Sequence, residues 1–165
     1  MRKILIYIGL LVTASGCQAQ TDLSVVVQDV RSSYSDVNHI STDSLASLAA
    51  ANQDVYILDT RSREEYDVSH IPGAIWIDPS DRTFPELTGV DKKTKIVAYC
   101  SVGYRSSKVA RRLSAAGYDD VANLEGSIFQ WANEGRQLVD GAGTASTVHQ
   151  YNERWGQLLH EELRH

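Results

Sequence analysis

The sequence predicts an α/β domain in which helices cover both faces of a central parallel sheet, with extra helices at the two ends of the chain. Short apolar runs alternate with longer stretches whose apolar residues recur at helical spacing. Strands that are buried on both faces read as such uninterrupted apolar runs. The 165 residues suit one domain with short extensions, and a hydrophobic content of 42% is enough for a buried core.

The start of the chain reads as an export signal. Two basic residues precede an apolar run, Ile4–Val12, that is too short to span a bilayer comfortably. The small residues Ala14–Gly16 then lead to Cys17, and this segment resembles a bacterial lipobox, in which the cysteine becomes acylated. We therefore expect residues 1–16 to be a lipoprotein signal peptide, and the mature protein to be exported and to face the periplasm.

The residues after Cys17 indicate which membrane would hold a lipid attached to this cysteine. Gln18 is not acidic, and by resemblance to lipoprotein sorting rules it favours the outer membrane. The alternative is cleavage after Ala19 by ordinary signal peptidase, which would leave no lipid. If Cys17 is acylated, Cys100 is the one remaining thiol, and it has no partner for an internal disulfide.

The charge balance argues against nucleic acid as a partner. The formal net charge is -5, and no run of like charge is long enough to suggest a nucleic-acid tail. No cluster of Cys and His has the spacing of metal ligands, so neither a metal nor another cofactor is expected.

Residues 17–38 are predicted to form a tether followed by an amphipathic helix. Its apolar side is made of residues spaced three or four apart: Leu23, Val26, Val27, Val30, Tyr34 and Val37. The polar side is not basic, so we expect the helix to pack on the domain rather than lie on a membrane surface.

The domain itself is predicted over residues 39–140. Its first half reads as a brief strand at His39–Ile40, a helix capped by Ser41 or Thr42, and strands at Val55–Asp59 and Ile75–Ile77. Residues 60–69 are charged and read as irregular, and residues 70–74 carry the Pro-Gly signal of a turn. Two prolines limit residues 78–91 to loop with at most one helical turn.

The second half continues the alternation of strand and helix. It reads as a strand at Lys95–Tyr99, a helix over Ser107–Ala116, a strand at Val121–Leu124, and a helix from Ser127 to near Gly135. Gly141–Gly143 then reads as a flexible link. Residues 141–165 are predicted to be a C-terminal helical extension, in which Asn152 caps a helix with Trp155, Leu158, Leu159 and Leu163 on one side.

The chemistry gathers where the strand at Lys95–Tyr99 ends. Cys100 follows this strand, a loop with Gly103 comes next, and Arg105 closes the loop as a helix begins. The first turn of a helix presents unpaired N–H groups and a partial positive charge, and a tight loop adds inward amides. Both effects favour the thiolate, which is the reactive form of cysteine.

Several stretches, in the same order, resemble the signatures of rhodanese domains. They are Asp59–Tyr66 with His70–Ala74, the loop Cys100–Ser106, and a closing stretch with Gly117, Tyr118, Asn123–Gly126 and Trp131. The resemblance extends over about Ile40 to Val139. It implies a five-stranded parallel core and sulfurtransferase activity, in which a cysteine takes a sulfane sulfur from a donor such as thiosulfate. The cysteine holds the sulfur as a persulfide and passes it to a nucleophilic acceptor.

By this resemblance Cys100 is the expected nucleophile. The donor is expected to bind the residues that follow it: Ser101, Val102, Gly103, Tyr104 and Arg105. Arg105 offers its charge either to the donor anion or to the loop carbonyls. Ser101 stands where thiosulfate-using members often carry arginine, which leaves the donor unnamed. Dual-specificity phosphatases share the fold but have a loop one residue longer, so loop length favours sulfur transfer over phosphate hydrolysis.

Other residues near the loop receive supporting roles. Asp59 and Arg61 are expected to form an ion pair or brace beside it, and Ser106 to cap the following helix. His70 is expected to order its turn, and Tyr104 to lie near the mouth, where it would set donor access.

Aromatic and basic side chains farther along the chain have simpler interpretations. Trp131 and Trp155 are expected to be packing anchors. Lys108, Arg111 and Arg112 share one helix face, which is either solvated or steers anionic donors toward the loop.

Two functions of different class follow from the sequence. The first is a membrane-anchored sulfurtransferase, and the second is a non-catalytic binding or persulfide-carrier module tethered to the cell envelope. The presence of Cys100 favours the enzyme. Because one thiol offers no resolving cysteine, the sulfur must leave to an external acceptor, which is cyanide, a small thiol or the cysteine of a partner.

Overall fold

A computed structural model describes residues 22–51 and 53–165 of the chain. The expected signal peptide, residues 1–16, the expected lipid site at Cys17 and the tether up to residue 21 lie outside the described residues. Within the described part of the chain, no helix combines the length and the hydropathy needed to cross a membrane.

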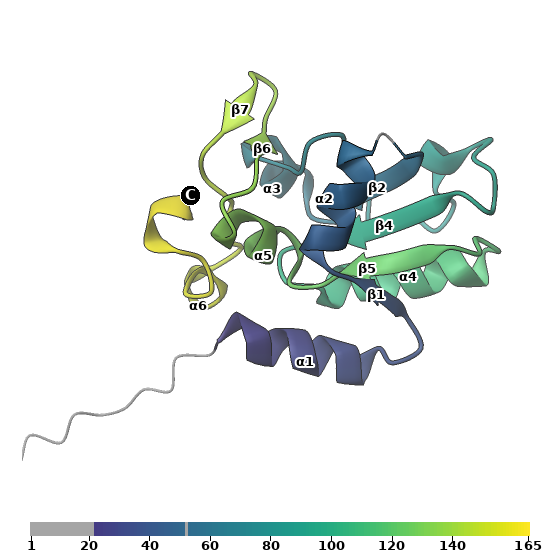
Figure 1. The fold of residues 1–165 in the computed structure, drawn as a ribbon, viewed down its shortest axis with the longest axis horizontal. Helices are drawn as coiled ribbons and strands as arrows, with labels where there is room; N and C mark the ends of the chain where they lie inside the picture. The colour runs from purple at the N-terminus through teal and green to yellow at the C-terminus, as the bar shows by residue number, and fades with distance from the viewer. Residues whose placement is uncertain (1–21, 52) are drawn as a thin grey trace, which may run out of the picture.

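Five parallel strands form the central sheet in the order β1-β5-β4-β2-β3 (Figure 1). They are β1 (Asn38–Ile40), β2 (Val55–Asp59), β3 (Ile75–Trp76), β4 (Lys95–Tyr99) and β5 (Val121–Leu124). The central strand β4 is fully buried from Ile96 to Tyr99, which is why it reads as an uninterrupted apolar run. The predicted fold class is confirmed.

Helices cover both faces of this sheet. α4 (Tyr104–Ala115) packs on β4 and β5, and α1 (Leu23–Ser33) lies on the same side (Figure 1). α2 (Thr42–Ala50) and α3 (Arg63–Val68) cover the other side, as right-handed crossovers between parallel strands require. α5 (Ser127–Asn133), which follows the last strand of this sheet, contacts α2 on that side. Asp59 and Tyr99 are register partners, so β2 and β4 end at the same edge of the sheet.

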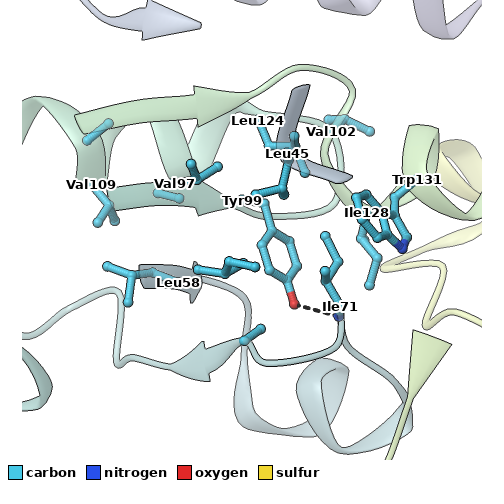
Figure 2. Packing of buried hydrophobic residues seen from close by; sticks show 14 of the residues in the cluster. Leu45, Leu58, Ile71, Val97, Tyr99, Val102, Val109, Leu124, Ile128 and Trp131 are labelled. Atoms are coloured by element: carbon cyan, nitrogen blue, oxygen red, sulfur yellow. Dashed lines mark hydrogen bonds between the residues drawn. The ribbon is translucent and has the colours of Figure 1, made fainter. Parts of the chain in front are cut away.

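The core beneath this edge centres on Tyr99 (Figure 2). Leu58, Val97 and Leu124, from three adjacent strands, are completely buried with it. The Tyr99 hydroxyl accepts the N–H of Ile71 at 3.1 Å and donates to Asp59 Oδ2 at 2.6 Å. Its polar atom is therefore satisfied, and it joins the sheet edge to the turn that follows α3.

Two expectations outside the loop are largely confirmed, although α1 ends at Ser33, so that Tyr34 and Val37 are buried beyond the helix rather than on it. α1 is a helix whose buried side holds Leu23, Val26 and Val30, with Asp22 as its N-cap. Residues 78–91 contain a single 3-10 turn, Pro85–Leu87, in an otherwise irregular segment.

The stretch 60–69 differs from its predicted irregular structure, because it contains α3. Ser62 forms a capping box with Glu65: Ser62 Oγ accepts the Glu65 N–H at 3.3 Å, and Glu65 Oε2 accepts the Ser62 N–H at 3.0 Å. A helix of six residues is too short to show apolar periodicity. The local sign of this helix is therefore its capping box.

The start of α4 also differs from the prediction. The helix begins at Tyr104 rather than Ser107, and its N-cap is Gly103, with a φ of 119°. Ser106 is therefore not the cap that the sequence predicted. It lies in the first turn, completely buried, and its hydroxyl donates to Asn123 Oδ1 at 2.6 Å, which ties α4 to β5.

The C-terminal extension is less helical than predicted. Gly141–Gly143 connects β6 (Leu138–Val139) to β7 (Thr144–Ala145) in a hairpin instead of serving as a flexible link. Asn152 caps a helix as expected, but this helix, α6 (Glu153–Gly156), is a single turn, and a 3-10 turn, Glu161–Leu163, follows it. Leu158 and Leu159 are buried, so the extension packs through apolar side chains.

Candidate active site

The loop Cys100–Arg105 connects the end of β4 to α4 and folds around the Cys100 sulfur. The N–H of Gly103 donates a hydrogen bond to Cys100 Sγ at 3.1 Å. Gly103 has a left-handed backbone, and a Cβ at this position would come within 3.3 Å of Asn123 Nδ2 and of Val30 Cγ1. Any side chain at residue 103 would therefore strain the loop and crowd both β5 and α1.

The start of α5 holds the loop carbonyls away from the sulfur. The N–H of Ile128 donates to the Cys100 carbonyl at 3.2 Å, and that of Phe129 to the Ser101 carbonyl at 3.1 Å. Ser127 Oγ accepts the Cys100 N–H at 3.2 Å. With its carbonyls bonded to α5, the loop turns N–H groups toward the sulfur, an arrangement that suits an anion.

Cys100 is buried, yet its surroundings favour the thiolate. The residue is only 1% exposed, and burial alone raises the pKa of a thiol. The positive charge of Arg105, the polar groups of Ser106 and the N–H of Gly103 outweigh this effect and hold the pKa of Cys100 below its usual value. The N-terminus of α4 acts in the same direction, so the geometry favours a reactive thiolate.

Arg105 is not a free cation, because Glu65 binds it with both oxygens. Arg105 Nη1 donates to Glu65 Oε2 at 2.7 Å, and Nη2 donates to Glu65 Oε1 at 2.8 Å. Ser101 Oγ joins the pair, since it accepts from Arg105 Nη2 at 2.9 Å and donates to Glu65 Oε1 at 3.0 Å. Arg105 was expected to offer its charge to a donor anion or to loop carbonyls, and most of its donors are instead used by this cluster.

Glu65 is a site residue that the sequence prediction missed. Burial raises the pKa of Glu65, but hydrogen bonds from Arg105 and from the Ser62 N–H, with the charge of Arg105, bring it down to about 2. Glu65 is therefore a carboxylate at neutral pH. The signal that could have found it is the spacing of Ser62 and Glu65, which is that of a capping box.

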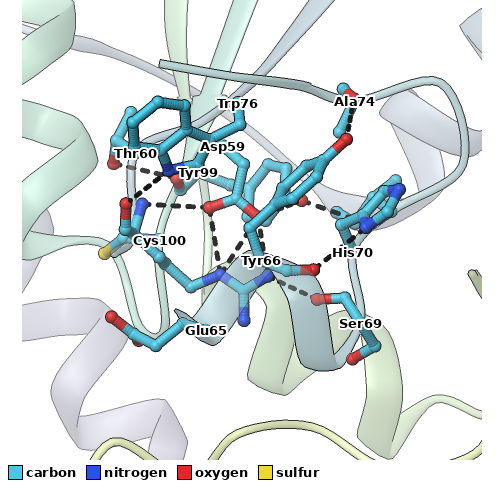
Figure 3. Close-up of polar contacts among 12 residues, drawn as sticks. Asp59, Thr60, Glu65, Tyr66, Ser69, His70, Ala74, Trp76, Tyr99 and Cys100 are labelled. Atoms are coloured by element: carbon cyan, nitrogen blue, oxygen red, sulfur yellow. Dashed lines mark hydrogen bonds and ion pairs between the residues drawn. The ribbon is translucent and has the colours of Figure 1, made fainter. Parts of the chain in front are cut away.

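Asp59 and Arg61 form the expected ion pair, and both side chains are completely buried. Arg61 Nη2 donates to Asp59 Oδ2 and to the Ser69 carbonyl, each at 2.6 Å. Figure 3 shows Asp59 surrounded by Tyr99, Tyr66 and Ser69. This cluster fixes the ends of β2 and β4 to the segment after α3. None of its residues lines the small cavity beside Cys100, which is described below, so we assign the cluster the role of positioning the loop.

His70 orders its turn, as predicted. Its ring stacks on Tyr66 with the two centroids 3.9 Å apart, and its Nδ1 lies 3.1 Å from the Tyr66 carbonyl (Figure 3). The backbone of His70 exchanges hydrogen bonds with Val139, which joins the turn to β6.

The basic side chains of Arg111 and Arg112 in α4 contact parts of the chain other than the catalytic loop. Arg111 Nε donates to Asp36 Oδ2 at 2.7 Å, and Arg112 Nη2 donates to the Pro79 carbonyl at 2.7 Å. Lys108 is exposed. Two of the three basic groups are thus bound by partners outside the loop, and none of the three lines the cavity beside Cys100.

This cavity has a volume of about 160 Å³. It is lined by the loop with Arg105 and by the rings of Tyr104, Tyr151 and Trp155. Trp155 was expected only to anchor packing; it does pack against Tyr104, with ring centroids 6.3 Å apart, but it also faces the cavity. Tyr151 was not singled out at all, because nothing in the local pattern brings residues of the extension to a loop about fifty positions earlier.

Larger grooves exist, but they lack a nucleophilic thiol. One of about 380 Å³ is lined by residues of α1 and α2, among them Arg31 and Thr42. Cys100 is the one free cysteine in the described part of the chain. Across residues 22–51 and 53–165 there is also no group of three or more His, Cys, Asp or Glu side chains arranged to hold a metal ion.

Comparison with known proteins places this site in context. The rhodanese-like domain family matches residues 41–134. A sulfurtransferase of Allochromatium vinosum is 33% identical over 107 residues, which cover 65% of this chain and 99% of that protein. A tRNA uridine(34) hydroxylase of Listeria monocytogenes is 39% identical over 89 residues, and the match covers only 27% of the hydroxylase.

Solved structures show the same fold. A rhodanese-like domain protein from Staphylococcus aureus aligns over 63% of this chain and 98% of its own, with 33% identity and a TM-score of 0.55. A thiosulfate sulfurtransferase from Pseudomonas aeruginosa aligns over 80% of this chain and 26% of its own, with a TM-score of 0.62. Its identity of 23% supports the shared fold alone.

Proposed function

This chain belongs to the rhodanese-like domain family, and we propose that it is a sulfurtransferase in which Cys100 carries the sulfur as a persulfide. Relatives support sulfur transfer at the level of the family, since a sulfurtransferase is matched over almost its whole length. The observation that carries the proposal is the setting of Cys100 Sγ, with the Gly103 N–H at 3.1 Å, a lowered pKa and the N-terminus of α4 beside it.

The reaction proceeds in two displacements at sulfur. The Cys100 thiolate attacks the outer sulfur of the donor, and the donor's bond to that sulfur breaks. With thiosulfate as the donor, sulfite leaves with the electron pair, so Cys–S⁻ and the thiosulfate dianion give Cys–S–S⁻ and sulfite. The outer sulfur of the persulfide carries the negative charge, which the inward N–H groups of the loop stabilise. An acceptor then attacks this outer sulfur and releases the Cys100 thiolate.

The acceptor in this scheme is an external molecule. Cys17 and Cys100 are the two cysteines of the sequence, and a lipid on Cys17 would leave Cys100 without an internal partner. A small thiol, cyanide or the cysteine of a partner protein fits this role. The matches to the hydroxylase relatives cover 27% to 38% of the length of those proteins, and their activity is not part of the proposal.

The proposed setting is the periplasmic face of the cell envelope. The apolar run Ile4–Val12 and the small residues before Cys17 support export and acylation of that cysteine. The test is a Cys17→Ala variant, which is expected to leave the membrane fraction. If this variant still sediments with membranes, the lipid anchor is refuted.

Mass spectrometry of the intact protein tests the sulfur transfer. The mature protein is incubated with thiosulfate, 3-mercaptopyruvate or glutathione persulfide, and the expected result is one added sulfur that disappears on addition of cyanide. Cys100→Ser should gain no sulfur. Absence of the adduct with all three donors would refute the enzyme and favour the alternative, a non-catalytic module that binds a partner.

A further inference from the structure

The walls of the cavity beside Cys100 are aromatic. Tyr104 comes from α4, whereas Tyr151 and Trp155 come from the C-terminal extension, beyond residues 41–134 that match the family. We refer to Tyr104, Tyr151 and Trp155 as the aromatic collar. The catalytic loop thus belongs to the family domain, while two of the three rings around it are supplied by a segment outside the family match.

Tyr151, which lines the cavity, has an unfavourable backbone conformation. Its φ is 67°, in the left-handed region that residues other than glycine seldom adopt. Its ring lies 5.0 Å from the guanidinium of Arg105, and the residue remains 51% exposed. A strained residue with a half-exposed ring gains little from core packing, which indicates that the ring serves the cavity.

The described residues that line the cavity offer no free positive charge. Arg105 is the one basic side chain among them, and Glu65 binds it with both carboxylate oxygens. The Ser101 hydroxyl is also committed to this pair. A thiosulfate dianion entering here would meet the loop amides but no unpaired cation, so much of its lost hydration would go uncompensated. Aromatic walls favour an organic group of low charge instead.

We propose that the aromatic collar selects an organic persulfide, R–S–SH, as the sulfur donor in preference to thiosulfate. The proposal rests on the proposed function, because it names the donor for the same Cys100. The R group packs against Tyr151 and Trp155 at the mouth, and the terminal sulfur reaches Cys100 Sγ.

The chemical step balances without any further reactant. The Cys100 thiolate attacks the terminal sulfur of R–S–SH, and a bond forms between Sγ and that sulfur. The bond between the two donor sulfurs breaks, and its electron pair leaves on R–S⁻. The proton stays on the transferred sulfur, which the loop amides then favour in its ionised form.

The test compares two donors at equal concentration: thiosulfate and the persulfide of N-acetylcysteine methyl ester, which has no charged group besides its –SH end. The rate of sulfur addition to Cys100 is followed by intact mass, with Cys100→Ser as the background. We expect Tyr151→Ala with Trp155→Ala to lower the ratio of organic-donor rate to thiosulfate rate by about tenfold. The intrinsic reactivities of the donors cancel when this ratio is compared between variant and wild type.

Matched variants control for a general loss of stability or folding. Val25→Ala removes a side chain of similar exposure, 57%, from α1 outside the cavity, and it should leave the ratio unchanged. Tyr151→Phe keeps the ring and should stay near wild type. Tyr151→Ala alone, at a half-exposed position, provides the measurement if the double variant does not fold.

The possible results separate the two proposals. Sulfur addition from both donors with an unchanged ratio in the collar variants would overturn the collar while leaving the sulfurtransferase intact. Sulfur addition from neither donor in the wild type would overturn both.

Discussion

Two arginine–carboxylate pairs take their carboxylates from the stretch Asp59–Glu65, and burial separates the roles of the pairs. The side chains of Asp59 and Arg61 are completely buried, and the pair does not line the cavity. Glu65 is 3% exposed and its partner Arg105 is 32% exposed, and Arg105 lines the cavity. The fully buried pair fixes geometry, whereas the pair at the cavity sets the charge around the thiolate. Removing one partner from each pair should therefore produce different defects.

The largest effect is expected from Arg61→Ala. It would leave the Asp59 carboxylate buried without its partner, and the loss of a buried ion-pair partner costs about 3–5 kcal/mol. Urea unfolding at pH 7 measures this change. A loss below about 1 kcal/mol would contradict the positioning role, because it would mean that Asp59 finds water or another partner.

Glu65→Gln should give a smaller loss that depends on pH. The pKa of Glu65 is about 2 in the folded protein against an ordinary 4.5, so its stabilising contribution is present above pH 4.5 and disappears as pH falls toward 2. The contribution at neutral pH is at most about 3 kcal/mol. Unfolding of wild type and variant at pH 7, 5 and 3 should therefore show a difference in stability that shrinks with acid. A difference that stays constant would disprove this linkage.

Arg105→Gln is expected to affect reactivity more than stability. The residue is one-third exposed, so the cost in stability should be about 1–2 kcal/mol. Because the Arg105 charge lowers the pKa of Cys100, its removal should raise that pKa and slow sulfur addition at pH 7. The rate of iodoacetamide alkylation against pH reports the shift, and Lys108→Gln, on the same helix, is the control. An inflection at the wild-type pH would contradict the role of Arg105.

The smallest effect is expected from Arg111→Ala, which breaks an exposed pair. Arg111 and Asp36 are each about half exposed, so water replaces their interaction readily. Neither the unfolding midpoint nor the rate of sulfur addition should change measurably. A clear loss would show that burial is the wrong criterion for ranking these pairs.

Residues next to one another in the sequence made the loop predictable. A buried parallel strand reads as an apolar run, so β4 and the position of Cys100 at its end follow from the local pattern. The Asp59–Arg61 pair joins residues two positions apart, and it too could be anticipated. The number of strands in the core follows from the family resemblance, whereas their order is not predicted, because strand pairing is not a local property.

The missed residues depend on contacts between distant segments. Glu65 contacts Arg105, which lies forty positions later in the sequence. It also lies on a six-residue helix whose charged sequence has no apolar periodicity. Tyr151 and Trp155 line the cavity because of how the C-terminal extension folds back on the domain. No spacing of residues in the sequence predicts this contact. Ser106 was misplaced as a cap because Gly103 starts α4 a turn earlier, without any side-chain cap.

The burial of Cys100 also bears on how long its thiolate stays reduced. A thiolate with a low pKa is open to oxidation by peroxide, and exposure controls the rate of that damage. With 1% exposure and aromatic rings at its entrance, Cys100 is expected to resist peroxide for longer in the folded chain than in the unfolded one. Intact mass after peroxide treatment measures this, and equal rates of oxygen addition would contradict it. A thiolate protected in this way stays in the reduced form that the proposed sulfur transfer requires.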